Sequence, residues 1–194
     1  MRELLIDRID SAIGTILLVS DGESLCALDY ADYEERLKRL LLRHYHEYHL
    51  RAVVNPQGFS NRIRAYLAGD LGSLNSIPVN TGGTPFQHQV WSTLRTIPPG
   101  TVLAYGEMAS RLGKPTSYRA VGMTNALNPI AIVVPCHRLV GANGALTGYA
   151  GGLERKRWLL QHEGVDLVKL ASVGAVAKDK RASCSRRPGS ETKH

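Results

Sequence analysis

The chain has 194 residues, 43% of them hydrophobic, and a formal net charge of +7. These numbers suit a globular protein of one compact body or two small lobes, and no apolar run approaches the ~20 residues that cross a bilayer. The cysteines at positions 26, 136 and 184 are odd in number and far apart, and the acidic N-terminus lacks a cleavage site; both features predict a cytoplasmic protein with free thiols rather than a secreted disulfide framework.

Short apolar runs at residues 4–9, 15–19 and 25–30 are separated by turn signals and predict three antiparallel strands. Residues 33–48 and 60–68 follow the helical period and predict two helices. At the end of the first of these regions and just after it lie His44, His46 and His49, whose spacing is not that of a zinc site, so we expect surface histidines and no metal.

Residues 69–85 are rich in Gly, Pro, Ser, Asn and Thr, and predict a boundary between an N-terminal α/β lobe (1–83) and a second domain (84–170). A helix then begins at Thr84 and Pro85. Helices at 105–112 and 118–126 flank a tight turn, which is the order of a helix-turn-helix DNA reader.

The positive charge is concentrated in the second half of the chain. Residues 1–85 hold 9 Lys+Arg against 11 Asp+Glu, whereas residues 86–170 hold 9 against 4. This asymmetry fits a binding surface for a polyanionic partner and a simple solvated charged face about equally well, so charge alone does not distinguish them. Residues 171–194 hold 6 Lys+Arg against 2 Asp+Glu and show no apolar period, so we expect a basic, flexible tail.

The chemistry is concentrated around Cys136. Residues 130–134 are apolar and mostly β-branched and predict a buried strand, which Pro135 ends so that the thiol sits on rigid support. A free thiol is mostly protonated at neutral pH and needs a base. His137 is the candidate base, acting through a water, and Glu163 is the candidate that orients its imidazole.

Six blocks of sequence together resemble the O6-alkylguanine-DNA alkyltransferases, in their small stand-alone bacterial form. Residues 135–138 read Pro-Cys-His-Arg, with Asn-Pro at 128–129 before them. The other blocks lie at residues 84–87, 97–105, 119–122, 148–153 and 158–164. The resemblance is strong from about residue 84 to 164 and looser before it.

The resemblance implies an α+β fold, with a three-stranded antiparallel sheet and helices in the N-terminal lobe. The mostly helical C-terminal domain would hold the helix-turn-helix and the Pro-Cys-His-Arg site. It also implies direct-reversal repair of double-stranded DNA: one irreversible transfer of an alkyl group from O6-alkylguanine to Cys136, with no cofactor. We expect the protein to be a monomer. The sequence leaves open whether O4-alkylthymine is also a substrate, which alkyl groups are accepted, and whether the protein binds DNA cooperatively.

The resemblance also implies roles for residues around the thiol. Asn128 would brace the cysteine turn, and Tyr105 would donate a hydrogen bond to N3 of the leaving guanine. Arg119 would fill the gap left by the flipped nucleotide, on a minor-groove helix whose small residues Ala120 and Gly122 allow close approach. The alkylguanine pocket would be walled by a set of three consecutive residues, Tyr149, Ala150 and Gly151.

The sequence departs from the family pattern at two points, and three other functions remain as alternatives to alkyl transfer. The structural zinc of some relatives is not expected, because Cys26 is the one cysteine of the N-terminal lobe, and Ala126 stands where some relatives have a basic residue. A non-enzymatic lesion binder would lack the cysteine. A helix-turn-helix regulator would need no thiol, and a cysteine hydrolase built on Cys136, His137 and Glu163 would not depend on DNA.

Overall fold

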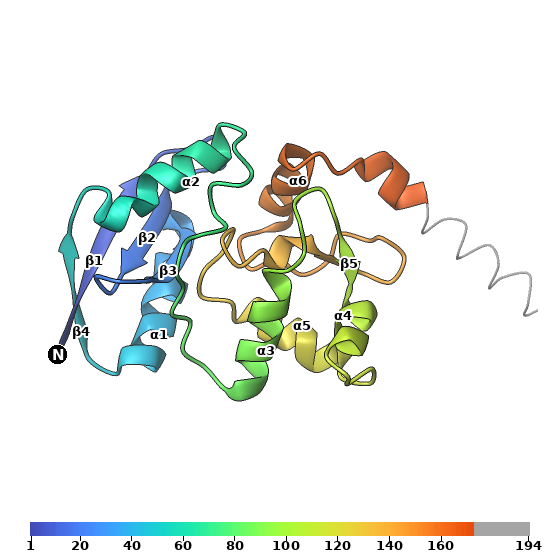
Figure 1. Ribbon diagram of the computed structural model, residues 1–194, viewed down its shortest axis with the longest axis horizontal. Coiled ribbons are helices and arrows are strands. Elements are labelled where there is room, and N and C mark those ends of the chain that lie inside the picture. The colour runs from blue at the N-terminus through green and yellow to red at the C-terminus, as the bar shows by residue number, and fades with distance from the viewer. Residues whose placement is uncertain (173–194) are drawn as a thin grey trace, which may run out of the picture.

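The structure, a computed structural model, describes residues 1–172 and confirms the expected α+β class (Figure 1). The strands are β1 (Arg2–Ile9), β2 (Ile16–Ser20), β3 (Leu25–Tyr30), β4 (Tyr48–Ala52), β5 (Leu103–Ala104) and β6 (Leu139–Val140). The α-helices are α1 (Glu34–Tyr45), α2 (Phe59–Leu67), α3 (Pro85–Leu94), α4 (Tyr105–Arg111), α5 (Tyr118–Ala126) and α6 (Leu153–His162). Short 3-10 helices are η1 (Ala31–Tyr33), η2 (Pro56–Gly58) and η3 (Cys136–Arg138).

Residues 167–172 are also helical, and the predicted tail lies, from residue 173 on, outside the described residues. In the part of the chain that the structure describes, no helix has the length and apolar character needed to cross a membrane.

The N-terminal sheet has four strands in the order β3-β2-β1-β4, so the prediction of three strands was wrong. β1, β2 and β3 pair antiparallel as expected, and β4 adds to β1 in parallel. The predicted helix over 33–48 was too long, because α1 ends at Tyr45, where His46 takes a φ of 60°. No Gly or Pro separates α1 from β4, so the break carries none of the usual sequence signals.

Helices α1 and α2 cover opposite faces of this sheet. Leu17 packs with Leu37 of α1, whereas its neighbour Leu18 belongs to the same cluster as Ile63 of α2. Side chains alternate between the faces of a strand, so covering both faces buries every residue of β2. The cluster on the α2 face continues into the second half of the chain and includes Trp91 of α3.

The free edge of β3 is occupied by two segments that follow α2 in the chain. Leu25 pairs with Val79 and Leu28 pairs with Ile130 in isolated bridges. The second bridge attaches the segment before Cys136 to the sheet, through hydrogen bonds from Leu28 N to Pro129 O and from Ala131 N to Leu28 O, both 2.9 Å.

The predicted strand over residues 130–134 is instead a buried turn. All five residues are buried, as expected, but Val134 N donates to Ile130 O at 3.0 Å and Ile132 has a φ of 68°. A buried apolar run predicts burial but not extended backbone, because periodicity cannot distinguish the two. A β-branched residue at positive φ is strained and must be held by its surroundings.

Helices α4 and α5 lie close to their predicted ranges, with Gly113 between them at a φ of 68°. They pack on each other at the end of the molecule away from β1 and β4 (Figure 1). α3 begins as expected, with Pro85 in its first turn and a capping box between Thr84 and Gln87.

Candidate active site

The turn before Cys136 is held by the side chain of Asn128. Its Nδ2 donates to Val134 O at 2.8 Å and to Ile130 O at 3.4 Å, and its Oδ1 accepts from Ile130 N at 3.0 Å. Asn128 is itself buried. These three hydrogen bonds satisfy backbone groups that no strand partner reaches, and so stabilise the positive φ of Ile132.

Cys136 follows this turn as the first residue of η3 and is 3% exposed. Its backbone carbonyl accepts from Asn125 Nδ2 at 3.2 Å. Burial raises the pKa of the Cys136 thiol, and a hydrogen bond with the Asn128 side chain offsets only part of that effect. The resting residue is therefore a neutral thiol, which needs a base to become a nucleophile.

His137 and Glu163 lie together although 26 residues separate them. His137 Nε2 is 2.9 Å from Glu163 Oε1, and both side chains are fully buried. Burial lowers the pKa of His137, so the ring is neutral. Because a carboxylate only accepts, Nε2 carries the proton and Nδ1 carries the lone pair. Nδ1 is buried and has no hydrogen-bond partner within the described residues, so it is available to accept a proton.

Two residues that had no predicted role complete the Glu163 site. Arg138 Nε and Nη2 donate to the two carboxylate oxygens at 2.9 and 2.7 Å, and Tyr66 Oη donates to Oε1 at 2.8 Å. Burial alone would raise the pKa of Glu163, but the hydrogen bonds from His137 and Arg138 and the positive charge of Arg138 outweigh it and hold the pKa well below its usual range. Arg138 stands inside the Pro-Cys-His-Arg motif, whereas Tyr66 belongs to α2 and carries no sequence signal.

Tyr105 contacts the loop that leads to α6. Its hydroxyl donates to Thr147 O at 3.4 Å and Gly148 O at 3.3 Å, both long contacts. Lys156, which sequence reasoning also missed, fixes the same loop with Nζ donating to Thr147 O at 2.6 Å and Leu139 O at 2.5 Å. Burial lowers the pKa of Lys156 to about 8.

The three predicted pocket-wall residues follow this loop, and Tyr149 lies beside His137. Their rings stand nearly perpendicular, with centroids 6.4 Å apart. Ala150 is half-buried and Gly151 is buried. The structure thus places Tyr149 beside the candidate base, and the loop of Thr147 and Gly148 between Tyr105 and Lys156.

The predicted DNA-binding residues lie on α5. Arg119 and Ala120 are exposed near the beginning of the helix, with the Arg119 guanidinium 5.8 Å from the Tyr118 ring centroid. Gly122 is half-buried behind them, and a Cβ there would lie 3.9 Å from the Tyr105 ring. α5 thereby connects an exposed basic surface to the interior of the site.

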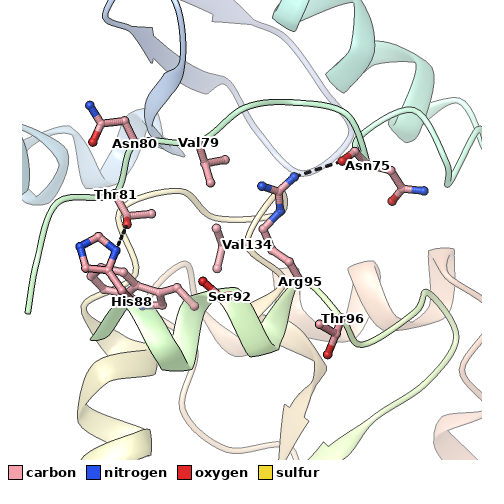
Figure 2. Close-up of a pocket in the computed structure, with 10 residues that line it drawn as sticks. Asn75, Val79, Asn80, Thr81, His88, Ser92, Arg95, Thr96 and Val134 are labelled. Atoms are coloured by element: carbon pink, nitrogen blue, oxygen red, sulfur yellow. Dashed lines mark hydrogen bonds between the residues drawn. The ribbon is translucent and has the colours of Figure 1, made fainter. Parts of the chain in front are cut away.

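A hollow of about 480 Å³ lies on another side of the cysteine turn (Figure 2). Thr81, His88 and Arg95 line it, and Val134 reaches it from the turn, but neither Cys136 nor His137 does. It is therefore not the site of the thiol chemistry. Among residues 1–172, no three His, Cys, Asp or Glu side chains lie close enough together to hold a metal ion.

Family models and relatives match nearly all of the described chain. Residues 4–81 match the ribonuclease-like domain of 6-O-methylguanine DNA methyltransferase, and residues 85–165 match its DNA-binding domain. A methylated-DNA–protein-cysteine methyltransferase of Shigella flexneri is 48% identical over 84% of this chain and 98% of its own. One of Mycobacterium tuberculosis is 42% identical over 80% and 89%. The structure of M. tuberculosis OGT in complex with DNA superposes with a TM-score of 0.69 at 37% identity, covering 87% and 98% of the two chains.

Proposed function

Because this chain belongs to the 6-O-methylguanine DNA methyltransferase family, we propose that Cys136 is the residue to which it transfers the alkyl group. Its activity is direct-reversal repair of O6-alkylguanine, and DNA is its partner. The observation that carries the assignment of Cys136 is the adjacent His137, whose Nε2 is bound by Glu163 and whose buried Nδ1 has no hydrogen-bond partner among residues 1–172.

In the proposed reaction, Sγ of Cys136 attacks the O6-alkyl carbon. The C–S bond forms as the C–O6 bond breaks, and the electron pair of the breaking bond goes to the guanine. The thiol proton passes through a water to Nδ1 of His137 and then, by way of solvent, to the guanine, which accepts it as it regains its unalkylated form and stays in the DNA strand. Glu163 stabilises the imidazolium that forms, because its carboxylate already holds Nε2 at 2.9 Å. The thioether is stable, so each molecule acts once.

Two further residues assist this step. Asn128 holds the turn, so that Sγ approaches along one direction. Tyr105 gives up its long contacts to the Thr147 and Gly148 carbonyls and donates to N3 of the leaving guanine, where negative charge builds. The pocket wall of Tyr149, Ala150 and Gly151 encloses the base.

The target carbon is inaccessible in stacked DNA, so the nucleotide must leave the helix. We place α5 in the minor groove, with exposed Arg119 filling the gap and with Ala120 and Gly122 allowing close approach. We propose that the protein binds DNA as a monomer. A cytoplasmic location stays a prediction from the dispersed cysteines.

The test is intact-protein mass after mixing with duplex DNA that contains one O6-methylguanine. A gain of one methyl group per protein, mapped to Cys136 and lost in Cys136→Ser, is the expected result. A gain that maps to Cys26 or Cys184 would overturn the assignment of Cys136. No gain with retained lesion binding would indicate a non-enzymatic lesion binder, and no gain without lesion preference would leave the regulator and the hydrolase.

A further inference from the structure

The last residue of β3, Tyr30, reaches the pocket wall from the N-terminal lobe. It is fully buried, and its hydroxyl lies 3.0 Å from the hydroxyl of Tyr149, 119 residues away in the chain. Buried tyrosine hydroxyls need a hydrogen-bond partner, and these two supply one for each other. Tyr149 in turn stands perpendicular to the His137 ring. Tyr30, a residue of the N-terminal sheet, is therefore linked through a single hydrogen bond to the tyrosine that stands next to His137.

The ring of Tyr30 also packs against the rest of the wall. A Cβ added to Gly151 would lie 2.4 Å from Cε2 of Tyr30, so the backbone of Gly151 rests directly on the ring. Arg155 covers the ring with its guanidinium 4.1 Å from the centroid. The same guanidinium donates to Gly151 O at 3.1 Å and to Ile13 O at 2.8 Å.

These contacts leave the wall little freedom to move by itself. The hydroxyl of Tyr149 is hydrogen-bonded to Tyr30 of the N-terminal sheet. The backbone of Gly151 packs on the same ring and is linked through Arg155 to Ile13, in the loop between β1 and β2. Burial raises the pKa of both Tyr30 and Tyr149, so neither hydroxyl ionises near neutral pH and the bond between them persists.

We propose that Tyr30 is a positioning residue that fixes the ring of Tyr149 beside Cys136 and so selects for small alkyl groups. The inference rests on the proposed function of Cys136. A methyl group fits beside a fixed wall, whereas a bulky group such as benzyl must displace it. The N-terminal lobe thereby takes part in substrate selection without touching the DNA.

The variant Tyr30→Phe keeps the packed ring and removes only the hydroxyl. Losing one hydrogen bond of about 1 kcal/mol corresponds to about a fivefold change in rate. We expect single-turnover transfer from O6-methylguanine in duplex DNA to slow by about fivefold. The ratio of the benzyl rate to the methyl rate should rise, because the released wall moves aside more easily. A loss of general stability would lower both rates and leave their ratio unchanged.

A double-mutant cycle distinguishes this mechanism from a general effect of Tyr30. Tyr149→Phe removes the same hydrogen bond from the other side, so the double variant should resemble either single variant rather than show the product of both effects. Tyr33→Phe is the matched control, because Tyr33 lies 5.9 Å from the same Arg155 guanidinium but has no hydrogen bond to Tyr149 among the described residues.

The outcomes separate the two proposals. An unchanged benzyl-to-methyl ratio in Tyr30→Phe, or fully multiplicative effects in the double variant, would overturn the role of Tyr30 and leave Cys136 untouched. Absence of transfer by the unmodified protein would instead overturn the proposed function. If Tyr30→Phe fails to fold, Tyr149→Phe alone tests the same bond through the same ratio.

Discussion

The Glu163→Gln variant tests the buried network behind the thiol. The carboxylate accepts from Tyr66, from His137 and twice from Arg138, all within 2.7–2.9 Å. A glutamine has one oxygen and an amide group that donates, so it cannot accept all four hydrogen bonds. The change also leaves the guanidinium of Arg138, whose side chain is 8% exposed, without its counter-charge.

Removing one partner of a buried ion pair costs about 3–5 kcal/mol. At about 2–4 °C for each kcal/mol in a chain of this size, the midpoint of thermal unfolding should fall by about 6–20 °C. Circular dichroism measures this midpoint, and urea titration gives the free energy of unfolding directly. Glu154→Gln, an exposed position on α6, the helix that ends just before Glu163, is the control and should leave the midpoint within about 2 °C.

The transfer rate of Glu163→Gln should fall as well, because nothing then fixes the proton of His137 on Nε2. A variant as stable as the Glu154→Gln control would refute the reasoning about the buried pair. Full activity, whatever the stability, would refute the part of Glu163 in orienting His137.

The same network predicts how stability depends on pH. The folded pKa of Glu163 lies below its usual value, so its contribution is fully present above the unfolded carboxyl pKa of about 4.3. That contribution is lost as the pH falls from there towards the folded pKa. Between about pH 5 and about pH 3, the unmodified protein should lose stability more steeply than Glu163→Gln. Equal slopes would contradict the depressed pKa.

Three other substitutions test a buried ion pair between β3 and α1, the DNA surface and the turn. Arg36→Met leaves the buried Asp29 carboxylate without its partner and should lower the free energy of unfolding by about 3–5 kcal/mol, against little change for the exposed Arg39→Met. Arg119→Ala should slow transfer from duplex DNA by about tenfold, which corresponds to losing about 1.4 kcal/mol of compensation for the unstacked base, and should spare free O6-benzylguanine; equal losses on both would refute a role in the duplex. Asn128→Ala should lower the free energy of unfolding by about 1–3 kcal/mol and slow transfer, which denaturation and single-turnover assays measure.

Elements marked by local signals could be predicted from the sequence. Gly113 separates α4 from α5, Thr84 and Pro85 begin α3, and apolar runs between turns mark the first three strands. The candidate site residues could be proposed because Cys136 and His137 are adjacent and their blocks resemble a known family. In each case the information lies within a few residues of the chain.

The features that could not be predicted depend on contacts between distant residues. The turn over residues 130–134 exists because Asn128 and the edge of β3 satisfy its backbone, although its own residues favour a strand. Tyr66 and Tyr30 look like ordinary core tyrosines in sequence, and only the packing of the N-terminal lobe on the second half brings their hydroxyls to Glu163 and Tyr149.

The burial of Cys136 also affects how long a molecule stays usable before it meets DNA. Peroxide and other small electrophiles react with thiolates far faster than with thiols. Burial raises the pKa of this cysteine, and only 3% of the residue is exposed. Before DNA binds, small electrophiles therefore meet an uncharged thiol with almost no accessible surface. Under the proposed mechanism one stray reaction would end the working life of the protein. The burial that keeps Cys136 a neutral, unreactive thiol in the free protein therefore also protects it from side reactions until an alkylated base occupies the site.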